Sequence, residues 1–97
     1  MRIIAKSTIK QYWQKHPDVE SALKAWFYDA SRANWKNPND IKDIYRNASI
    51  LANNRVVFNI KGNNYRLIVH LRYDLGIVFI RFIGTHAEYD KIDHNTI

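Results

Sequence analysis

The stretch RVVFNIKGNNYRLIVHLRYDLGIVFIRFI, residues 55–83, determines the fold class that the sequence predicts. It contains three runs that are rich in Val, Ile, Phe and Tyr and free of proline: residues 55–60, 65–71 and 77–83. The intervening segments, KGNN and YDLG, carry the Gly and Asn residues that hairpin turns need. We therefore expect three consecutive strands, joined by two hairpins into an antiparallel meander.

Apolar residues recur at helical spacing in the part of the chain that precedes this stretch. Residues 1–4 predict a brief strand, and residues 7–16 predict a short amphipathic helix that Ser7 caps. A longer apolar stripe predicts the main helix over residues 17–33, and a further helical turn is expected after Asn39. The order of elements indicates the α+β class, with the N-terminal strand and helices packed on one face of a mainly antiparallel sheet.

Length and composition indicate a single domain over residues 1–97. A chain of this length buries only about two-thirds of its unfolded surface, which supports one modest core. The composition, 46% hydrophobic and 13% aromatic, is typical of a folded protein. The absence of cysteine excludes disulfides and thiolate metal sites, and no segment has the length of a signal peptide core or membrane span. We expect a cytoplasmic protein without a membrane partner.

The net charge of the chain is +6, from 15 Lys and Arg against 9 Asp and Glu, which favours a nucleic acid partner. Side chains alternate along a strand, so Leu67 and Val69 should face the helices while Ile68 faces away. The polar residues expected on this second, uncovered face are Arg55, Asn59, Lys61, Arg66, His70 and Arg72, with Arg81 as a further candidate. The alternative is a sheet face that is polar because water covers it, but no acid occurs in these strands before Asp74.

The segment GTHAEYDKID, residues 84–93, follows the last predicted strand. Residues 85–92 contain neither Gly nor Pro, so a helical turn with Thr85 as its cap is expected. His86, Tyr89 and Asp90 would then lie three and four residues apart on one side of the turn. The segment therefore brings several chemically active side chains to the end of the sheet.

These side chains suit the cleavage of RNA without a metal ion. The 2′-hydroxyl attacks the adjacent phosphate, one group takes its proton, another protonates the leaving 5′-oxygen, and cations stabilise the added charge. Histidine can give or take a proton near neutral pH, whereas tyrosine needs cationic neighbours to act as a base. Several potential metal ligands occur, but they lack a compact ligand pattern, so no metal or other cofactor is expected. The potential ligands are His70, His86, Asp90, Asp93 and His94, and we assign Asp93 and His94 to a solvated tail.

Residues 56–93 resemble the HigB family of toxins, which are RelE-like, ribosome-dependent mRNA interferases of type II toxin–antitoxin systems. The matching motifs are FNIKGNNYRL, FIR and GTHAEYDKI. The resemblance implies a small RelE-like α+β domain with endoribonuclease activity. It also implies cleavage of translated mRNA in the A site of the 30S subunit, inhibition of translation and growth, and neutralisation by a HigA-type helix-turn-helix antitoxin.

The resemblance also implies roles for individual residues. Arg66 corresponds to the strand arginine that holds the scissile phosphate. His86 and Tyr89 correspond to the pair that performs or supports proton transfer, without a separate assignment of acid and base. Together with the basic face, the motifs give a set of expected RNA contacts. These are Lys61, Arg81, Lys91, Arg72 and Asn59.

Two other functions remain open at this point. The chain could be a noncatalytic basic module that binds nucleic acid or a protein partner, or an inactive toxin homologue retained for antitoxin binding. An RNA-binding sheet would carry an aromatic pair on its open face, and a DNA-binding module would carry a basic recognition helix. Neither feature is evident in the sequence, because Trp13, Trp26 and Trp35 are predicted to pack in the core.

Overall fold

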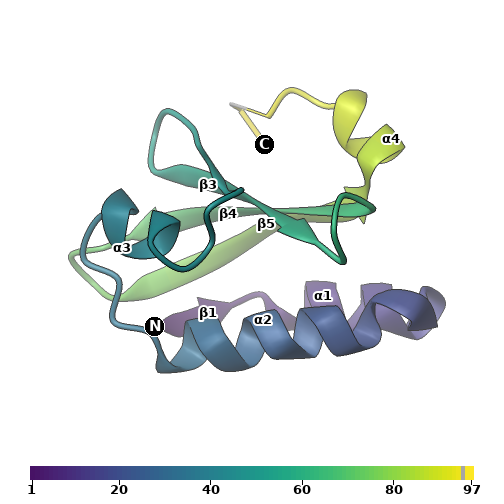
Figure 1. The fold of residues 1–97 in the computed structure, drawn as a ribbon, viewed down its shortest axis with the longest axis horizontal. Helices are drawn as coiled ribbons and strands as arrows, with labels where there is room; N and C mark the ends of the chain where they lie inside the picture. Colours follow the sequence, from purple (N-terminus) through teal and green to yellow (C-terminus); the bar gives the residue numbers. More distant parts are fainter. Residues whose placement is uncertain (95) are drawn as a thin grey trace.

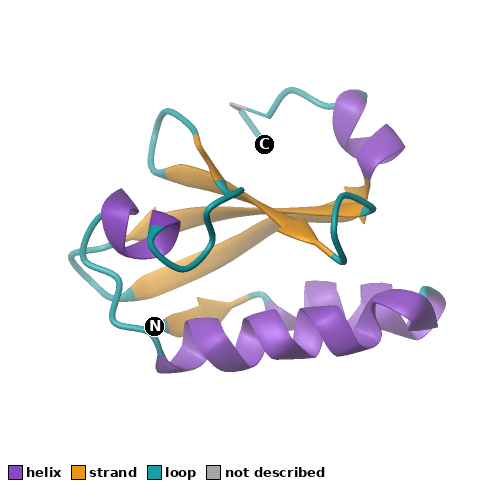
Figure 2. Ribbon diagram, viewed as in Figure 1, coloured by secondary structure: helices purple, strands orange, loops and turns teal. Residues whose placement is uncertain are grey.

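A computed structural model describes residues 1–94 and 96–97 of the chain (Figure 1, Figure 2). The fold is α+β, as predicted, with a mixed sheet of five strands and helices on both of its sides. In chain order the elements are β1 (Arg2–Ile4), α1 (Lys6–Lys15), the 3₁₀ helix η1 (Pro17–Val19), α2 (Glu20–Arg32), α3 (Pro38–Lys42), β2 (Ser49–Ile50), β3 (Arg55–Ile60), β4 (Tyr65–Arg72), β5 (Ile77–Thr85) and α4 (His86–Asp90).

The strands lie in the order β1-β5-β4-β3-β2. The predicted meander is confirmed, because β3, β4 and β5 pair antiparallel with one another through the two hairpins. The N-terminal strand β1 pairs parallel with β5, and the two-residue strand β2, which the sequence did not predict, pairs antiparallel with β3. β4 is therefore the central strand, and its side chains lie in the middle of both faces.

The main core lies between one face of the sheet and helices α1 and α2, which lie on the same side of it (Figure 1). Its centre is Phe58 on β3, which is fully buried against the rings of Trp26, Trp35 and Tyr45. The predicted core position of Trp26 and Trp35 is confirmed, and Trp13 packs at the edge of the same cluster. This layer of aromatic rings holds the sheet rigidly from one side.

Two predicted helix caps are wrong. Helix α1 begins after Ala5, which adopts a left-handed conformation at φ 67° and accepts a backbone bond from Thr8 at 3.0 Å. Helix α3 is capped by Asn37, whose side chain accepts from the backbone of Asp40 at 3.2 Å. Pro38 then occupies the first helical position, where its missing N–H is not needed.

A β-bulge in β5 changes which residues share the second face of the sheet. Ile68 pairs with Phe82 but Val69 pairs with Ile80, so Arg81 is an extra residue without an opposite partner. Phe82 therefore lies on the same face as Phe79. The sequence showed no aromatic pair on this face because regular alternation would have placed these two rings on opposite faces.

The prediction of an uncovered, basic second face is wrong in two respects. Val57 and Ile68 on that face are 2% and 0% exposed, and α4 and the C-terminal segment lie on this side, opposite α1 and α2 (Figure 1). The C-terminal segment returns as far as Arg55, whose Nε donates to the Ile97 carbonyl at 2.9 Å. Lys61 is not on this face, because its backbone is left-handed at φ 54° and its side chain reaches Asp18 in η1.

Candidate active site

Helix α4 begins with a complete capping box, which confirms Thr85 as the predicted cap. The Thr85 hydroxyl accepts from the Glu88 backbone at 3.1 Å, and the Glu88 carboxylate accepts from the Thr85 backbone at 2.7 Å. These bonds lower the pKa of Glu88, the backbone bond from Thr85 being the main cause. Glu88 also accepts a hydrogen bond from the Tyr12 hydroxyl at 3.3 Å. A single carboxylate thus joins the first turn of α4 to helix α1.

Gly84 leaves the space that lets α4 sit close to the end of β5. A Cβ atom at this position would lie 2.5 Å from Cζ of Phe82 and 3.1 Å from Oε1 of Glu88. The ring and the capping carboxylate therefore occupy the volume where any other residue would carry its side chain. The backbone of Gly84 also lies directly opposite Arg66 on β4.

Gly84→Ala is expected to destabilise the domain and displace α4. The added methyl overpacks the site, which costs about 1–3 kcal/mol and lowers the melting temperature by about 5 °C or more for a domain of this size. Thermal unfolding followed by circular dichroism measures the effect. Phe82→Leu removes the ring atom that the methyl meets, so the double variant should recover part of the loss. An unchanged melting temperature in Gly84→Ala contradicts the prediction.

Arg66 is a buried cation, only 9% exposed, on the second face of β4. Its Nη1 donates to the carbonyls of Asn63 at 2.9 Å and Tyr65 at 3.2 Å. Within the described residues no carboxylate is close enough to form an ion pair with it. A guanidinium held by carbonyls but not neutralised retains its charge and its remaining donors for an anion such as phosphate.

Tyr89 lies next to this guanidinium, with its ring centroid 5.8 Å from Cζ of Arg66. Burial raises the pKa of Tyr89, and Asp90 adds to the increase, while the charge of Arg66 opposes it. The net direction is upward, so the phenol is protonated at neutral pH and is able to donate a hydrogen bond. Burial outweighs the nearby cation, so the charge of Arg66 does not turn this tyrosine into a base in this structure.

His94 also packs against this tyrosine. Its ring stacks on Tyr89 with centroids 3.7 Å apart and planes 9° apart, and its Nε2 donates to the Tyr89 carbonyl at 2.7 Å. The assignment of His94 to a solvated tail is wrong, because the chain turns back after α4. No periodicity or motif in the sequence indicates this return.

His86 and Asp90 form an oriented pair on the exposed side of α4. Nδ1 of His86 lies 3.0 Å from the Asp90 carboxylate, one helical turn away. Because a carboxylate accepts, Nδ1 carries the proton, and Nε2 of the neutral ring is left to accept another. The backbone N–H of His86 donates to Asn64 at 3.1 Å, which ties α4 to the β3–β4 turn beside Arg66. Arg66, His86 and Tyr89 are thus all at one end of the sheet.

The five expected RNA contacts are distributed more widely. Asn59 lies directly opposite Arg66, and Lys91 is exposed immediately after α4. Arg81 is exposed at the bulge in β5, and Arg72 lies at the far end of β4, where it pairs with Asp74 at 2.9 Å. Lys61 forms an ion pair of 3.3 Å with Asp18 on the helix side of the sheet. Asn59 and Lys91 lie near Arg66, and Lys61 is at the same end of the sheet but its side chain points to the helix side.

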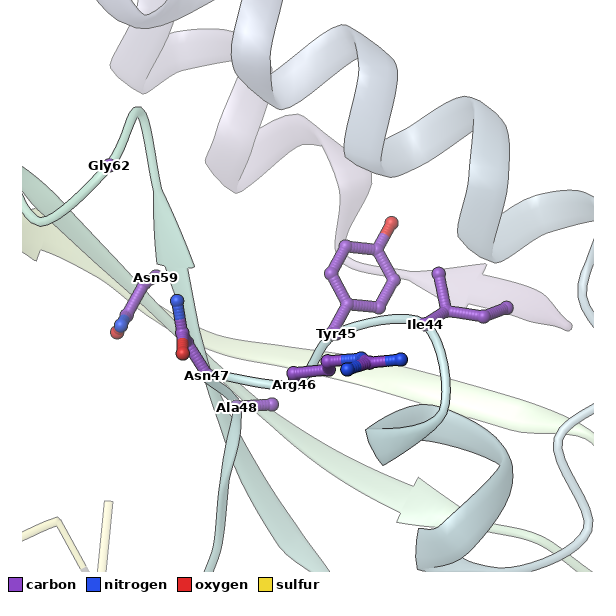
Figure 3. A pocket seen from close by; sticks show the side chains of 7 residues that line it. All are labelled: Ile44, Tyr45, Arg46, Asn47, Ala48, Asn59 and Gly62. Carbon is purple, nitrogen blue, oxygen red and sulfur yellow. The ribbon is translucent and has the colours of Figure 1, made fainter.

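A pocket of about 240 Å³ lies on the outer side of β3, with Asn59 in its lining (Figure 3). The side chains of Asn47 and Asn59 lie beside each other at its border, and Tyr45 lies farther along the pocket (Figure 3). The loop that carries Asn47 is held by Lys42, whose Nζ donates to the carbonyls of Arg46 and Ala48 at 2.6 and 2.8 Å. The pocket adds amide donors and acceptors to the edge of the candidate site.

Glu88, Gly84 and His94 are the parts of this site that the sequence prediction missed. The signal for Glu88 is present in the sequence, since Thr85 followed three residues later by Glu is the capping-box pattern. Within residues 1–94 and 96–97, no three His, Cys, Asp or Glu side chains are grouped so as to hold a metal ion. The helices formed by these residues are all too short or too polar to span a membrane.

Comparison with known proteins identifies the family to which this chain belongs. Residues 19–92 match the family model HigB_toxin, described as the RelE-like toxic component of a toxin–antitoxin system. The match covers most of the chain, and the chain belongs to the HigB toxin family. This confirms the resemblance seen in the C-terminal motifs.

Curated relatives agree with this assignment over nearly their full length. The chain is 27% identical over 94 residues to the mRNA interferase HigB of Escherichia coli O6:H1, covering 95% of this chain and 91% of that protein. It is 25% identical over 92 residues to the mRNA interferase toxin HigB of E. coli K12 and to the mRNA interferase HigB of Shigella flexneri. In both cases the match covers 93% of this chain and 88% of the relative.

Proposed function

We propose that this toxin is an mRNA interferase that cleaves translated mRNA in the ribosomal A site without a metal ion. The observation that carries the proposal is the buried guanidinium of Arg66, for which the described residues show no ion pair, with the ring of Tyr89 near it and the His86–Asp90 pair on the adjoining helix. The names of the curated relatives, mRNA interferase HigB, support the same activity. Cleavage would inhibit translation and growth.

The arrangement supports a division of roles among the three residues. His86, oriented by Asp90, accepts the 2′-hydroxyl proton at Nε2, and the freed oxygen forms a bond to the adjacent phosphorus. Arg66 neutralises the charge that grows on the phosphoryl oxygens. Tyr89, protonated at neutral pH, donates its phenolic proton towards the leaving 5′-oxygen as the P–O bond breaks. The products are a 2′,3′-cyclic phosphate and a free 5′-hydroxyl.

The proposed partners follow from the family and the charge. A toxin of this class is restrained by a cognate antitoxin, which we propose is a HigA-type helix-turn-helix protein acting in the cytoplasm. The net charge of +6 favours binding to ribosomal RNA as well as to mRNA. No cofactor takes part in the proposed reaction.

The test is to induce the toxin alone in cells and to map transcript ends with and without active translation. The proposal expects new ends that disappear when translation is blocked, and growth arrest that is relieved by co-expression of the protein encoded beside the toxin. Cleavage that persists without translation contradicts ribosome dependence. Intact transcripts and normal growth contradict the interferase function itself.

Binding of the toxin to ribosomes is expected to weaken steeply with salt. If four basic residues neutralise RNA phosphates, affinity should fall about 50-fold between roughly 50 and 200 mM monovalent salt, because counterions are released on binding. Sedimentation of the toxin with ribosomes over this range measures the slope. A flat dependence would show that the basic residues do not contact phosphate.

One observation favours a second function, noncatalytic RNA binding. Phe79 and Phe82 form an aromatic pair on the second sheet face, which is the arrangement expected of an RNA-binding sheet. A protein that only binds RNA would leave transcript ends unchanged in the experiment above. The same aromatic pair can also serve a nuclease.

A further inference from the structure

We propose that Phe79, Phe82 and His70 form a stacking surface that binds the bases of the single-stranded mRNA extending from Arg66. This inference rests on the proposed function, because it takes the RNA to be the substrate cleaved at that arginine. It assigns a binding role to residues that neither the sequence motifs nor the comparisons identify. The surface would hold the mRNA on the toxin on one side of the cleaved bond.

The bulge at Arg81 creates this surface. Phe79 lies directly opposite His70 and Phe82 directly opposite Ile68, so all of them share the face that carries Arg66. Without the extra residue in β5, one of the two phenylalanines would point into the main core. The surface is therefore a product of strand register and not of sequence spacing.

The rings extend as a row away from the candidate active site. The ring of Phe82 lies over Gly84, which is the direct neighbour of Arg66 on β5. The ring of Phe79 lies 6.1 Å from that of His70, with planes 32° apart. His70 lies four positions after Arg66 along β4, which is about 13 Å at roughly 3.3 Å per residue. Stacked bases rise about 3.4 Å each, so this length accommodates several nucleotides.

Basic side chains flank the rings on both sides. Arg55 lies directly opposite His70, where its Nε donates to the Ile97 carbonyl, Arg72 lies two residues farther along β4, and Arg81 is exposed at the bulge. Burial lowers the pKa of His70, and these three arginines lower it further, so its ring is neutral and suited to stacking. Among the described residues of this cluster the one acid is Asp74, which Arg72 neutralises.

This combination favours RNA over a protein as the occupant. Aromatic faces alternating with arginines match the alternation of bases and phosphates in a single strand, and stacking accepts every base. Phe82 and Gly84 lie between Phe79 and Arg66 on the same face, on the β5 side of the buried Ile68, so one strand passing along β5 would reach both.

The experiment measures binding separately from cleavage. A short, fluorescently labelled single-stranded RNA with 2′-O-methyl groups cannot supply the attacking hydroxyl, so the purified toxin binds it without cutting it. Anisotropy should show that Phe79→Leu weakens binding about tenfold, since loss of a stacking aromatic typically has an effect of this order. Phe79→Trp should retain or strengthen binding. Phe27→Leu, a half-buried phenylalanine on α2, is the matched control and should bind like the unchanged protein.

The outcomes separate an RNA-stacking surface from a protein interface, and they test the stacking surface separately from the interferase function. Equal binding by the unchanged protein and Phe79→Leu at the same melting temperature overturns the proposal, as does equal binding of single-stranded and duplex RNA. Loss of antitoxin binding without loss of RNA binding in Phe79→Leu overturns it in favour of a protein interface. If transcripts are uncut in cells but Phe79→Leu still weakens binding of the RNA, the proposed interferase function is wrong and the stacking surface is supported. If the Phe79 effect is absent and cleavage is normal, only the stacking surface fails.

Discussion

Arg66→Ala is expected to reduce mRNA cleavage about a hundredfold or more, which corresponds to about 3 kcal/mol of lost transition-state stabilisation. The guanidinium is buried and held at the end of the sheet by the carbonyls of Asn63 and Tyr65, so its position does not have to be acquired when substrate binds. Single-turnover cleavage of mRNA on programmed ribosomes measures the loss. Arg66→Lys keeps the positive charge but loses the planar guanidinium. Its cleavage rate should therefore lie between that of the unchanged toxin and that of Arg66→Ala.

The control for this prediction is Arg32→Ala. Arg32 lies over the ring of Tyr28 on α2, away from α4, so its removal lowers the net charge by the same amount without touching the candidate site. Normal cleavage by Arg66→Ala, with a melting temperature close to that of the unchanged protein, would contradict the assignment of the active site to Arg66. An equal loss in both variants would indicate that net charge alone governs activity.

His86→Ala is expected to lower the cleavage rate about a hundredfold to ten-thousandfold, the range for a proton-transfer group. Asp90→Asn should also lower the cleavage rate. The amide can donate to Nδ1, which places the imidazole proton on Nε2 and prevents Nε2 from accepting the 2′-hydroxyl proton. Single-turnover rates on ribosomes measure both. Asp43→Asn, an exposed acid after α3, is the matched control and should be neutral. Activity that survives in His86→Ala would mean that this histidine is merely a surface residue.

The sequence predicted well those features that depend on neighbouring residues. The β3–β4 turn contains Gly and Asn, the β4–β5 turn contains Asp and Gly, and both Gly62 and Gly76 have positive φ. The capped turn at Thr85 depends only on residues 85–88. The cluster of Arg66, His86 and Tyr89 was predicted from these elements, because consecutive antiparallel strands bring their ends together. Local chemistry was sufficient to predict this part of the site.

Features that depend on tertiary packing could not be predicted in this way. The bulge at Arg81 follows from which residues of β5 pack against the helices, and it reverses the faces of the residues after it. The stacking of His94 on Tyr89 requires the chain to return over the sheet after α4. The upward shift of the Tyr89 pKa comes mainly from burial, which depends on tertiary packing, so its proposed role as a proton donor could not be predicted from residue types.

Gly84 has a genetic consequence. A toxin gene expressed without its antitoxin selects for survivors, and their mutations identify the codons that tolerate change least. Every missense change at a glycine codon adds a side chain, and at this position the space is already taken by Phe82 and Glu88. The codon for residue 84 therefore offers many separate single-step routes to a harmless protein that still contains every residue of the proposed chemistry.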